Sequence, residues 1–178
     1  MKAFSFVATM ILCARPGPSD ASQEIQFDAA TAFMVPAPLP GFGVTYVYSP
    51  TQRFALDVGA EWRFVSNGPQ FSIVPRFVLG GETDRFMAGA GIQAGWIDAQ
   101  GGGQKFFRGS GATYSVRADL VGYEHRFASG VSLSVSAGVA VGLAGARFCV
   151  IECRPGEEDR DWRGAVLPQG RLSIGRWF

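Results

Sequence analysis

Residues 131–143 read VSLSVSAGVAVGL, and this stretch decides the fold class because its side chains alternate between two kinds. Every odd position from Val131 to Leu143 is aliphatic, and every even position is Ser, Gly or Ala. A helix would scatter the two sets around its circumference, whereas a strand places them on opposite faces. The stretch therefore predicts a β-strand with one bulky apolar face and one face of small residues.

The same two-residue period recurs along the chain and predicts eight strands. We expect them over residues 25–35, 42–48, 53–64, 70–79, 85–97, 113–127, 131–143 and 166–178. Proline cannot donate a hydrogen bond to a β-ladder, so Pro75 predicts a bulge or a local gap. An even number of antiparallel strands closes into a sheet without edges, as hydrocarbon surroundings require. We therefore predict an all-β fold, an eight-stranded antiparallel up-and-down transmembrane β-barrel.

The connections between the expected strands alternate in length. Short turns lie at 49–52, 80–84 and 128–130, whereas the two longest connections are residues 98–111 and 147–164. Short turns inside and long loops outside are typical of outer-membrane barrels, which places both chain ends in the periplasm. Aromatic residues near the strand ends predict two interfacial girdles. The outer girdle comprises Trp62, Phe64, Trp96 and Tyr114, and the inner one Phe54, Phe86, Phe127, Trp177 and Phe178.

The opposite face of the expected strands carries charges of both signs. The inward set is Asp28, Asp57, Glu61, Arg63, Arg76, Arg85, Arg117, Asp119 and Arg171. An eight-stranded barrel is only wide enough for side chains to fill it, so we expect an internal salt-bridge network. Asp57 and Glu61 are about 13 Å apart along a strand, which is too far for two carboxylates acting on one bond. A soluble lipocalin-like barrel is the alternative fold, with its apolar face inward.

The first 21 residues have the layout of a secretory signal. Lys2 precedes an apolar run of about a dozen residues, and Ser19-Asp20-Ala21 offers a cleavage site, which predicts a signal peptide over 1–21 and a barrel domain over 22–178. Cys149 and Cys153 then remain as a pair, which in an exported chain favours a disulfide. A metal site would need further ligands, and the only histidine, His125, has no matching spacing.

The last eight residues, RLSIGRWF, end an alternating strand on an aromatic residue. This ending resembles the C-terminal signal of bacterial outer-membrane barrels, and the resemblance implies that Ile174, Trp177 and Phe178 are read by the barrel assembly machinery. The whole mature chain resembles the small outer-membrane barrels of the OmpA-barrel and OmpX type. That resemblance implies a place in the outer membrane of a Gram-negative bacterium, in contact with its lipids.

These features favour a non-enzymatic barrel with a side-chain-filled polar lumen. Its expected role is structural, or is a surface interaction in which loops 98–111 and 147–164 meet an extracellular ligand or surface partner. A small porin-like channel and a lipid A-modifying enzyme are the alternatives. The lipid A deacylase family uses a His followed two residues later by Ser, but here the residue two after His125 is Phe127. We expect no cofactor and no metal. The net charge of +1 without basic clusters argues against a nucleic-acid partner.

Overall fold

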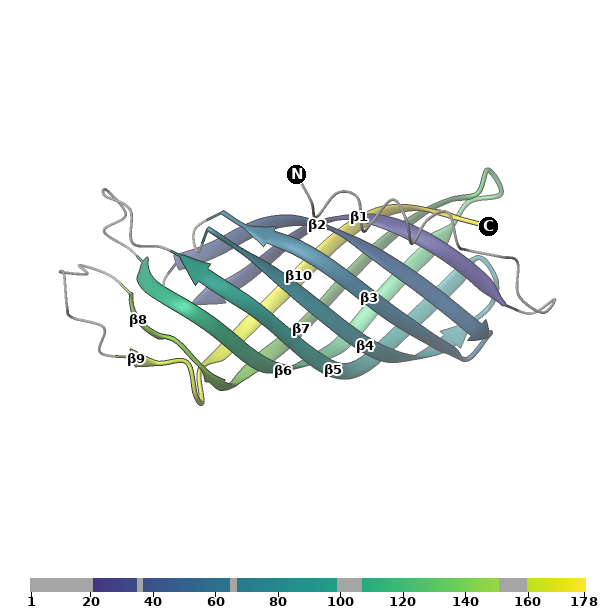
Figure 1. Cartoon of the computed structure of the whole chain (residues 1–178). Coiled ribbons are helices and arrows are strands. Elements are labelled where there is room, and N and C mark those ends of the chain that lie inside the picture. The colour runs from purple at the N-terminus through teal and green to yellow at the C-terminus, as the bar shows by residue number, and fades with distance from the viewer. Residues whose placement is uncertain (1–20, 35–36, 65–66, 99–106, 151–159) are drawn as a thin grey trace.

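Eight long antiparallel strands close into a barrel in the computed structural model, which describes residues 21–34, 37–64, 67–98, 107–150 and 160–178. The strands are β1 (Ser22–Met34), β2 (Ala37–Thr51), β3 (Phe54–Arg63), β4 (Gly68–Gly80), β5 (Asp84–Asp98), β6 (Phe107–Arg126), β7 (Val131–Gly145) and β10 (Val166–Trp177). Each pairs with its neighbours along the chain, β10 pairs with β1, and the sheet is continuous around the barrel (Figure 1). The predicted fold class is confirmed. Within the described ranges, no helix is long and apolar enough to cross a membrane.

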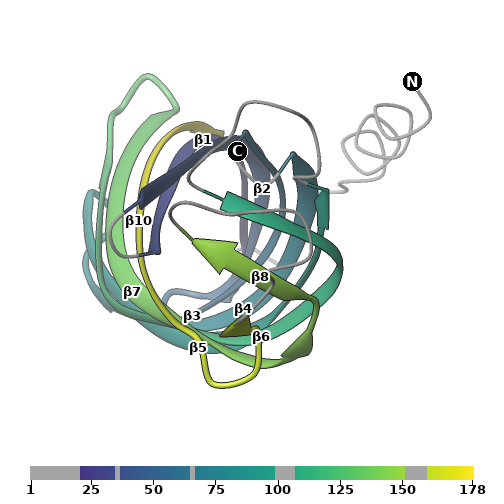
Figure 2. The ribbon, with the colours of Figure 1, turned by 90° about the vertical axis from the view of Figure 1, so that its left-hand side faces the viewer.

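Two short strands lie in the segment that was predicted to be only a loop. β8 (Arg147–Val150) pairs with the first residues of β6, and β9 (Arg160–Asp161) pairs with β8. β6 begins at Phe107, six residues before the predicted start. The backbone N–H and C=O groups of this first part are therefore available to pair with β8. In a view onto the end of the barrel that carries β8, this strand lies across part of the barrel opening (Figure 2).

Irregular pairing occurs where the sequence pattern is irregular. The β4–β5 ladder pairs Ile73 with Ile92 and resumes at Arg76 with Gly89, which leaves the predicted gap at Pro75 with the register unchanged. A bulge in β6 lies between Asp119 and Val121. The bulge shifts the phase of the strand, so that Leu120 and Val121 are both exposed although they are adjacent.

One end of the barrel, called here the turn end, carries the short connections β2–β3, β4–β5 and β6–β7. Gly80, the last residue of β4, and Gly130, in the β6–β7 turn, have φ of 123° and 83°, values that favour glycine. The beginning of β1 and the end of β10 lie there too, since the amide N–H of Gln23 donates to the carbonyl of Phe178 at 3.1 Å. The opposite end, called the loop end, carries β8 and β9 (Figure 1).

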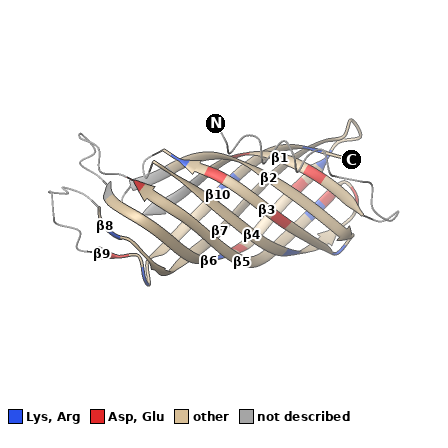
Figure 3. Ribbon diagram, in the orientation of Figure 1, with Lys and Arg blue, Asp and Glu red and all other residues tan. Residues whose placement is uncertain are grey.

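Polar and apolar residues are arranged inside out relative to a water-soluble barrel. Among the described residues, 23 polar or charged residues are buried against 12 hydrophobic ones, and 25 large hydrophobic residues are exposed. Acidic and basic positions recur along the barrel strands (Figure 3), and most of these side chains point into the lumen. The soluble lipocalin-like alternative predicted the reverse arrangement.

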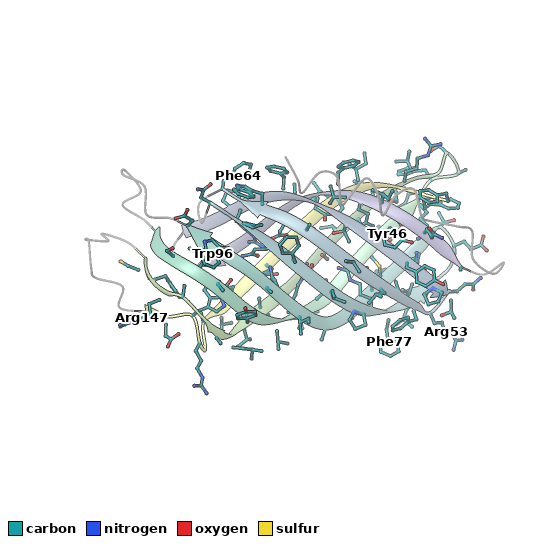
Figure 4. The ribbon with its side chains drawn as sticks, viewed as in Figure 1. Tyr46, Arg53, Phe64, Phe77, Trp96 and Arg147 are labelled. Carbon is teal, nitrogen blue, oxygen red and sulfur yellow. The ribbon has the colours of Figure 1, made fainter. Side chains whose placement is uncertain are left out.

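Aromatic side chains on the outer surface gather toward both ends. Phe64 and Trp96 lie toward the loop end, and Phe77 lies toward the turn end (Figure 4). Phe54 meets Phe77 edge to face, with ring centroids 6.4 Å apart, and Phe86 packs on Tyr123. Such belts suit the two interfaces of a bilayer.

Candidate functional site

The central part of the lumen is crossed by a network of buried ion pairs, called here the central network. Nη2 of Arg76 lies 3.0 Å from Oδ2 of Asp57 and 2.5 Å from Oδ2 of Asp119. Nε of Arg117 donates to Oδ1 of Asp119 at 2.8 Å. All four residues are at most 4 % exposed, so the charges balance one another away from solvent.

Arg171 ties this network to the other side of the barrel. Its guanidinium lies 3.1 Å from Oδ2 of Asp57 and 3.9 Å from Oδ2 of Asp28, and it donates to the hydroxyl of Thr45 at 3.2 Å. The Thr45 hydroxyl in turn donates to Asp28 at 2.5 Å. The network therefore joins three arginines to three aspartates and crosslinks side chains from β1, β2, β3, β4, β6 and β10.

Two glycines beside the central network stand where a Cβ atom would collide with a neighbour. A Cβ atom at Gly89 of β5 would lie 2.8 Å from Cγ of Arg76, and one at Gly138 of β7 would lie 2.9 Å from Cα of Asp119. Both distances are too short for carbon atoms that are not bonded. Gly89 thus leaves room for the Arg76 side chain, and Gly138 lets the backbones of β7 and β6 approach each other.

A second cluster of buried ion pairs, the turn-end cluster, lies in the lumen near the short turns. Arg85 lies 3.2 Å from Glu124 and donates to the hydroxyl of Ser49, while Arg126 contacts both Glu124 and Glu24. Glu24 also accepts hydrogen bonds from Gln26 and Ser132. Two arginines again meet two glutamates, and both glutamates are fully buried.

Polar side chains lie in the lumen at the loop end, beside the indole ring of Trp162. Arg63 pairs with Glu61, and the amides of Gln70, Gln93 and Gln169 form a hydrogen-bonded row across β4, β5 and β10. A cavity of about 10 Å³ beside this row is large enough for the centre of one water molecule.

Trp162, from the segment that joins β9 to β10, covers this layer. Its side chain is 3 % exposed, and its indole N–H lies 3.1 Å from the hydroxyl of Ser115 and 3.2 Å from the carbonyl of Tyr114. Phe148 of β8 packs against it edge to face, with 5.8 Å between ring centroids. The two short strands thus hold a tryptophan in the mouth of the barrel.

The structure brings together every inward charge that the sequence indicated, in three places. Asp28, Asp57, Arg76, Arg117, Asp119 and Arg171 lie in the central network, Arg85 in the turn-end cluster, and Glu61 and Arg63 at the loop end. Sequence reasoning missed Glu24, Glu124, Arg126 and Trp162. Glu24 was missed because β1 begins at Ser22 and not at residue 25, and Glu124 and Arg126 because the bulge in β6 shifts their phase.

Trp177 differs from its predicted place in the inner aromatic girdle. It pairs across the ladder with the inward residue Glu24 and lies 5.5 Å below the guanidinium carbon of Arg126, so it points into the turn end of the lumen. Ile174 and Phe178 are 57 % and 56 % exposed on the outer surface. Their part in an assembly signal stays a prediction.

His125 lies outside the lumen, near the turn end. Nδ1 of His125 is 2.8 Å from Oδ1 of Asp84, which also accepts a hydrogen bond from Tyr123 at 2.5 Å, and the His125 ring packs on Phe127. No group of three metal-ligating side chains occurs in the part of the chain that the structure describes.

The remaining predicted features lie partly outside the described residues. Cys149 is buried, but Cys153 falls in residues 151–159, so a bond between them stays a prediction. Residues 99–106 of the predicted loop 98–111 also lie outside the described residues, as do residues 1–20 of the predicted signal peptide 1–21.

One comparison with solved structures supports the fold. No protein-family model matches the chain, and no curated protein matches its sequence. The N-terminal β-barrel domain of Pseudomonas aeruginosa OprF superposes with a TM-score of 0.60 at 14 % identity, over 87 % of this chain and 97 % of that domain. Neisserial surface protein A (NspA) superposes with a TM-score of 0.49 at 15 % identity, over 91 % of this chain and 98 % of that one.

Proposed function

We propose that this chain, which has the fold of the small outer-membrane β-barrels, is an integral protein of a Gram-negative outer membrane with a filled lumen and no enzymatic activity. The observation that carries the proposal is the inverted distribution of side chains. Ile92, Leu120 and Phe77, which face outward, are 63 %, 65 % and 72 % exposed, while Arg76, Asp57 and Asp119 are buried.

The apolar outer surface suits a barrel that is surrounded by lipid. Water-soluble proteins rarely expose apolar patches larger than a few hundred Å², whereas here apolar side chains surround the barrel. Hydrocarbon surroundings remove that cost, and a closed barrel pairs the backbone groups that lipid cannot satisfy. Aromatic residues at both ends of the apolar band then meet the lipid headgroups.

The proposed structural role rests on the filled lumen. Three successive layers of paired side chains cross the interior, and Trp162 covers the outermost of them. A porin-like channel would require a continuous water path through all three. Ion pairs between strands far apart in sequence brace the wall of the barrel instead.

We expect no stable conductance when the protein is inserted into planar lipid bilayers. The variant Trp162→Ala is expected to remain silent as well, because the central network and the turn-end cluster still block the lumen. Single-channel recording checks both. Steady current steps in the wild type would contradict a filled lumen. Steps that appear only in Trp162→Ala would mean that the indole alone blocks ion flow and that the central network and the turn-end cluster do not.

The loop end is the proposed surface for an extracellular ligand or surface partner. Loops carry function more often than the scaffold that positions them. The described parts of the two longest predicted loops, the start of β6 within 98–111 and β8 within 147–164, pair with each other at the loop end. We propose that a Cys149–Cys153 disulfide ties the second loop, that residues 1–21 are removed on export, and that the barrel assembly machinery reads Ile174, Trp177 and Phe178. Outer-membrane lipids are the partners of the apolar band.

A further inference from the structure

A cavity of about 310 Å³ opens at the turn end of the barrel, outside the turn-end cluster. The residues that line it include Ser22, Ser49, Glu82, Arg85, Arg126 and Trp177. The volume is at the small end of the range of ligand pockets. None of the proposed structural roles uses this space.

The inner wall of the cavity presents guanidinium groups. The side chains of Arg85 and Arg126 are 4 % and 9 % exposed, and their carboxylate partners Glu24 and Glu124 are fully buried and do not line the cavity. Arg85 has five N–H donors, and its side-chain acceptors are Glu124 and Ser49. Donors therefore remain for a carboxylate that enters from the opening.

The cavity also carries one negative charge and one aromatic surface. Glu82, in the exposed β4–β5 turn, lines the cavity and has no partner in the turn-end cluster. A simple anion would meet the arginines favourably but would be repelled by this carboxylate. Trp177, held under Arg126, adds an apolar wall. Opposite charges on two sides of one small cavity fit a ligand that carries both charges.

We infer that the turn-end cavity binds a small zwitterion of short-peptide chemistry. Its carboxylate accepts hydrogen bonds from Arg85 and Arg126, its ammonium group lies beside Glu82, and its body packs on Trp177. This site goes beyond the proposed structural role and is reached from the turn end, opposite the loops. It does not depend on which ligand, if any, the loops meet.

The test is titration of the detergent-folded protein with alanylalanine, with binding measured by isothermal titration calorimetry. We expect saturable binding with a Kd of about 1 mM, in keeping with so few ligand atoms. The C-terminal amide and the N-acetyl derivative of the dipeptide should each bind roughly tenfold more weakly, since each lacks one charged contact. Inorganic phosphate serves as the simple-anion probe and should bind more weakly than the dipeptide.

Variants assign each charge to its residue. Glu82→Gln should remove the penalty on the N-acetyl derivative while leaving the penalty on the amide, and Arg85→Lys should weaken the dipeptide roughly tenfold because lysine lacks the planar fork. Glu82 is exposed, so its variant tests the proposal even if Arg85→Lys does not fold. Asp98→Asn, at the loop end, is the matched control and should change nothing.

Three results would overturn the inference. The first is the absence of saturable binding by the free dipeptide. The second is binding of the free and blocked dipeptides with equal affinity, and the third is phosphate binding as tightly as the dipeptide.

Discussion

The variant Arg171→Met is expected to lower the free energy of unfolding by about 3–5 kcal/mol, because removing one member of a buried ion pair leaves an uncompensated charge. Arg171 on β10 contacts Asp57 of β3 and Asp28 of the adjacent strand β1, and its loss leaves two arginines among three aspartates. Methionine keeps most of the side-chain volume. The change in the free energy of unfolding is measured by urea titration of the protein folded in lipid vesicles, with tryptophan fluorescence as the signal.

The matched control is Arg176→Met, on the same strand but exposed on the outer surface near the turn end, where the expected change is within about 1 kcal/mol. Adding Asp57→Asn to Arg171→Met restores equal numbers of positive and negative charges and should recover part of the loss. A cost for Arg171→Met no larger than that of Arg176→Met would mean that the central network does not stabilise the barrel.

Ile92→Arg is expected to destabilise the vesicle-folded protein by about 2–4 kcal/mol, the cost of arginine on the lipid face near the bilayer midplane. Ile92 is 63 % exposed and lies between Ile73 and Val116 on the neighbouring strands. The same urea titration in vesicles measures this cost.

The control for position is Ala128→Arg, in the exposed β6–β7 turn beyond the apolar band, where the expected cost is within about 1 kcal/mol. Were the outer surface in water, Ile92→Arg would be an ordinary surface substitution that changes stability by about 0.5 kcal/mol or less. Equal effects at positions 92 and 128 would therefore argue against a lipid-facing band.

The alternating sequence predicts most of this architecture because one face of every strand differs chemically from the other. Val131 to Leu143 needs no tertiary information to be read as a strand, and the inward charges from Asp57 to Arg171 follow from the same phase. Even the gap at Pro75 follows from its missing N–H group. Local pattern and global fold agree along these strands.

Features that depend on contacts between distant segments could not be read in this way. Trp162 lies in a charged stretch with no strand phase, and only the pairing of β8 with β6 brings it over the lumen. Trp177 occupies an aromatic position at a strand end, which suggests a girdle until the register with Glu24 turns it inward. The bulge in β6 likewise appears in the sequence only as two adjacent apolar residues, Leu120 and Val121.

Lipid-dependent folding, assayed by gel mobility, tests most directly whether this barrel belongs in a membrane. Denatured protein is diluted into buffer with or without lipid vesicles and run in detergent gels before and after boiling. We predict a heat-sensitive band of altered mobility only when vesicles are present, because only lipid can cover the apolar outer surface. A compact, heat-sensitive form that appears equally well in buffer without lipid would contradict a membrane-spanning barrel.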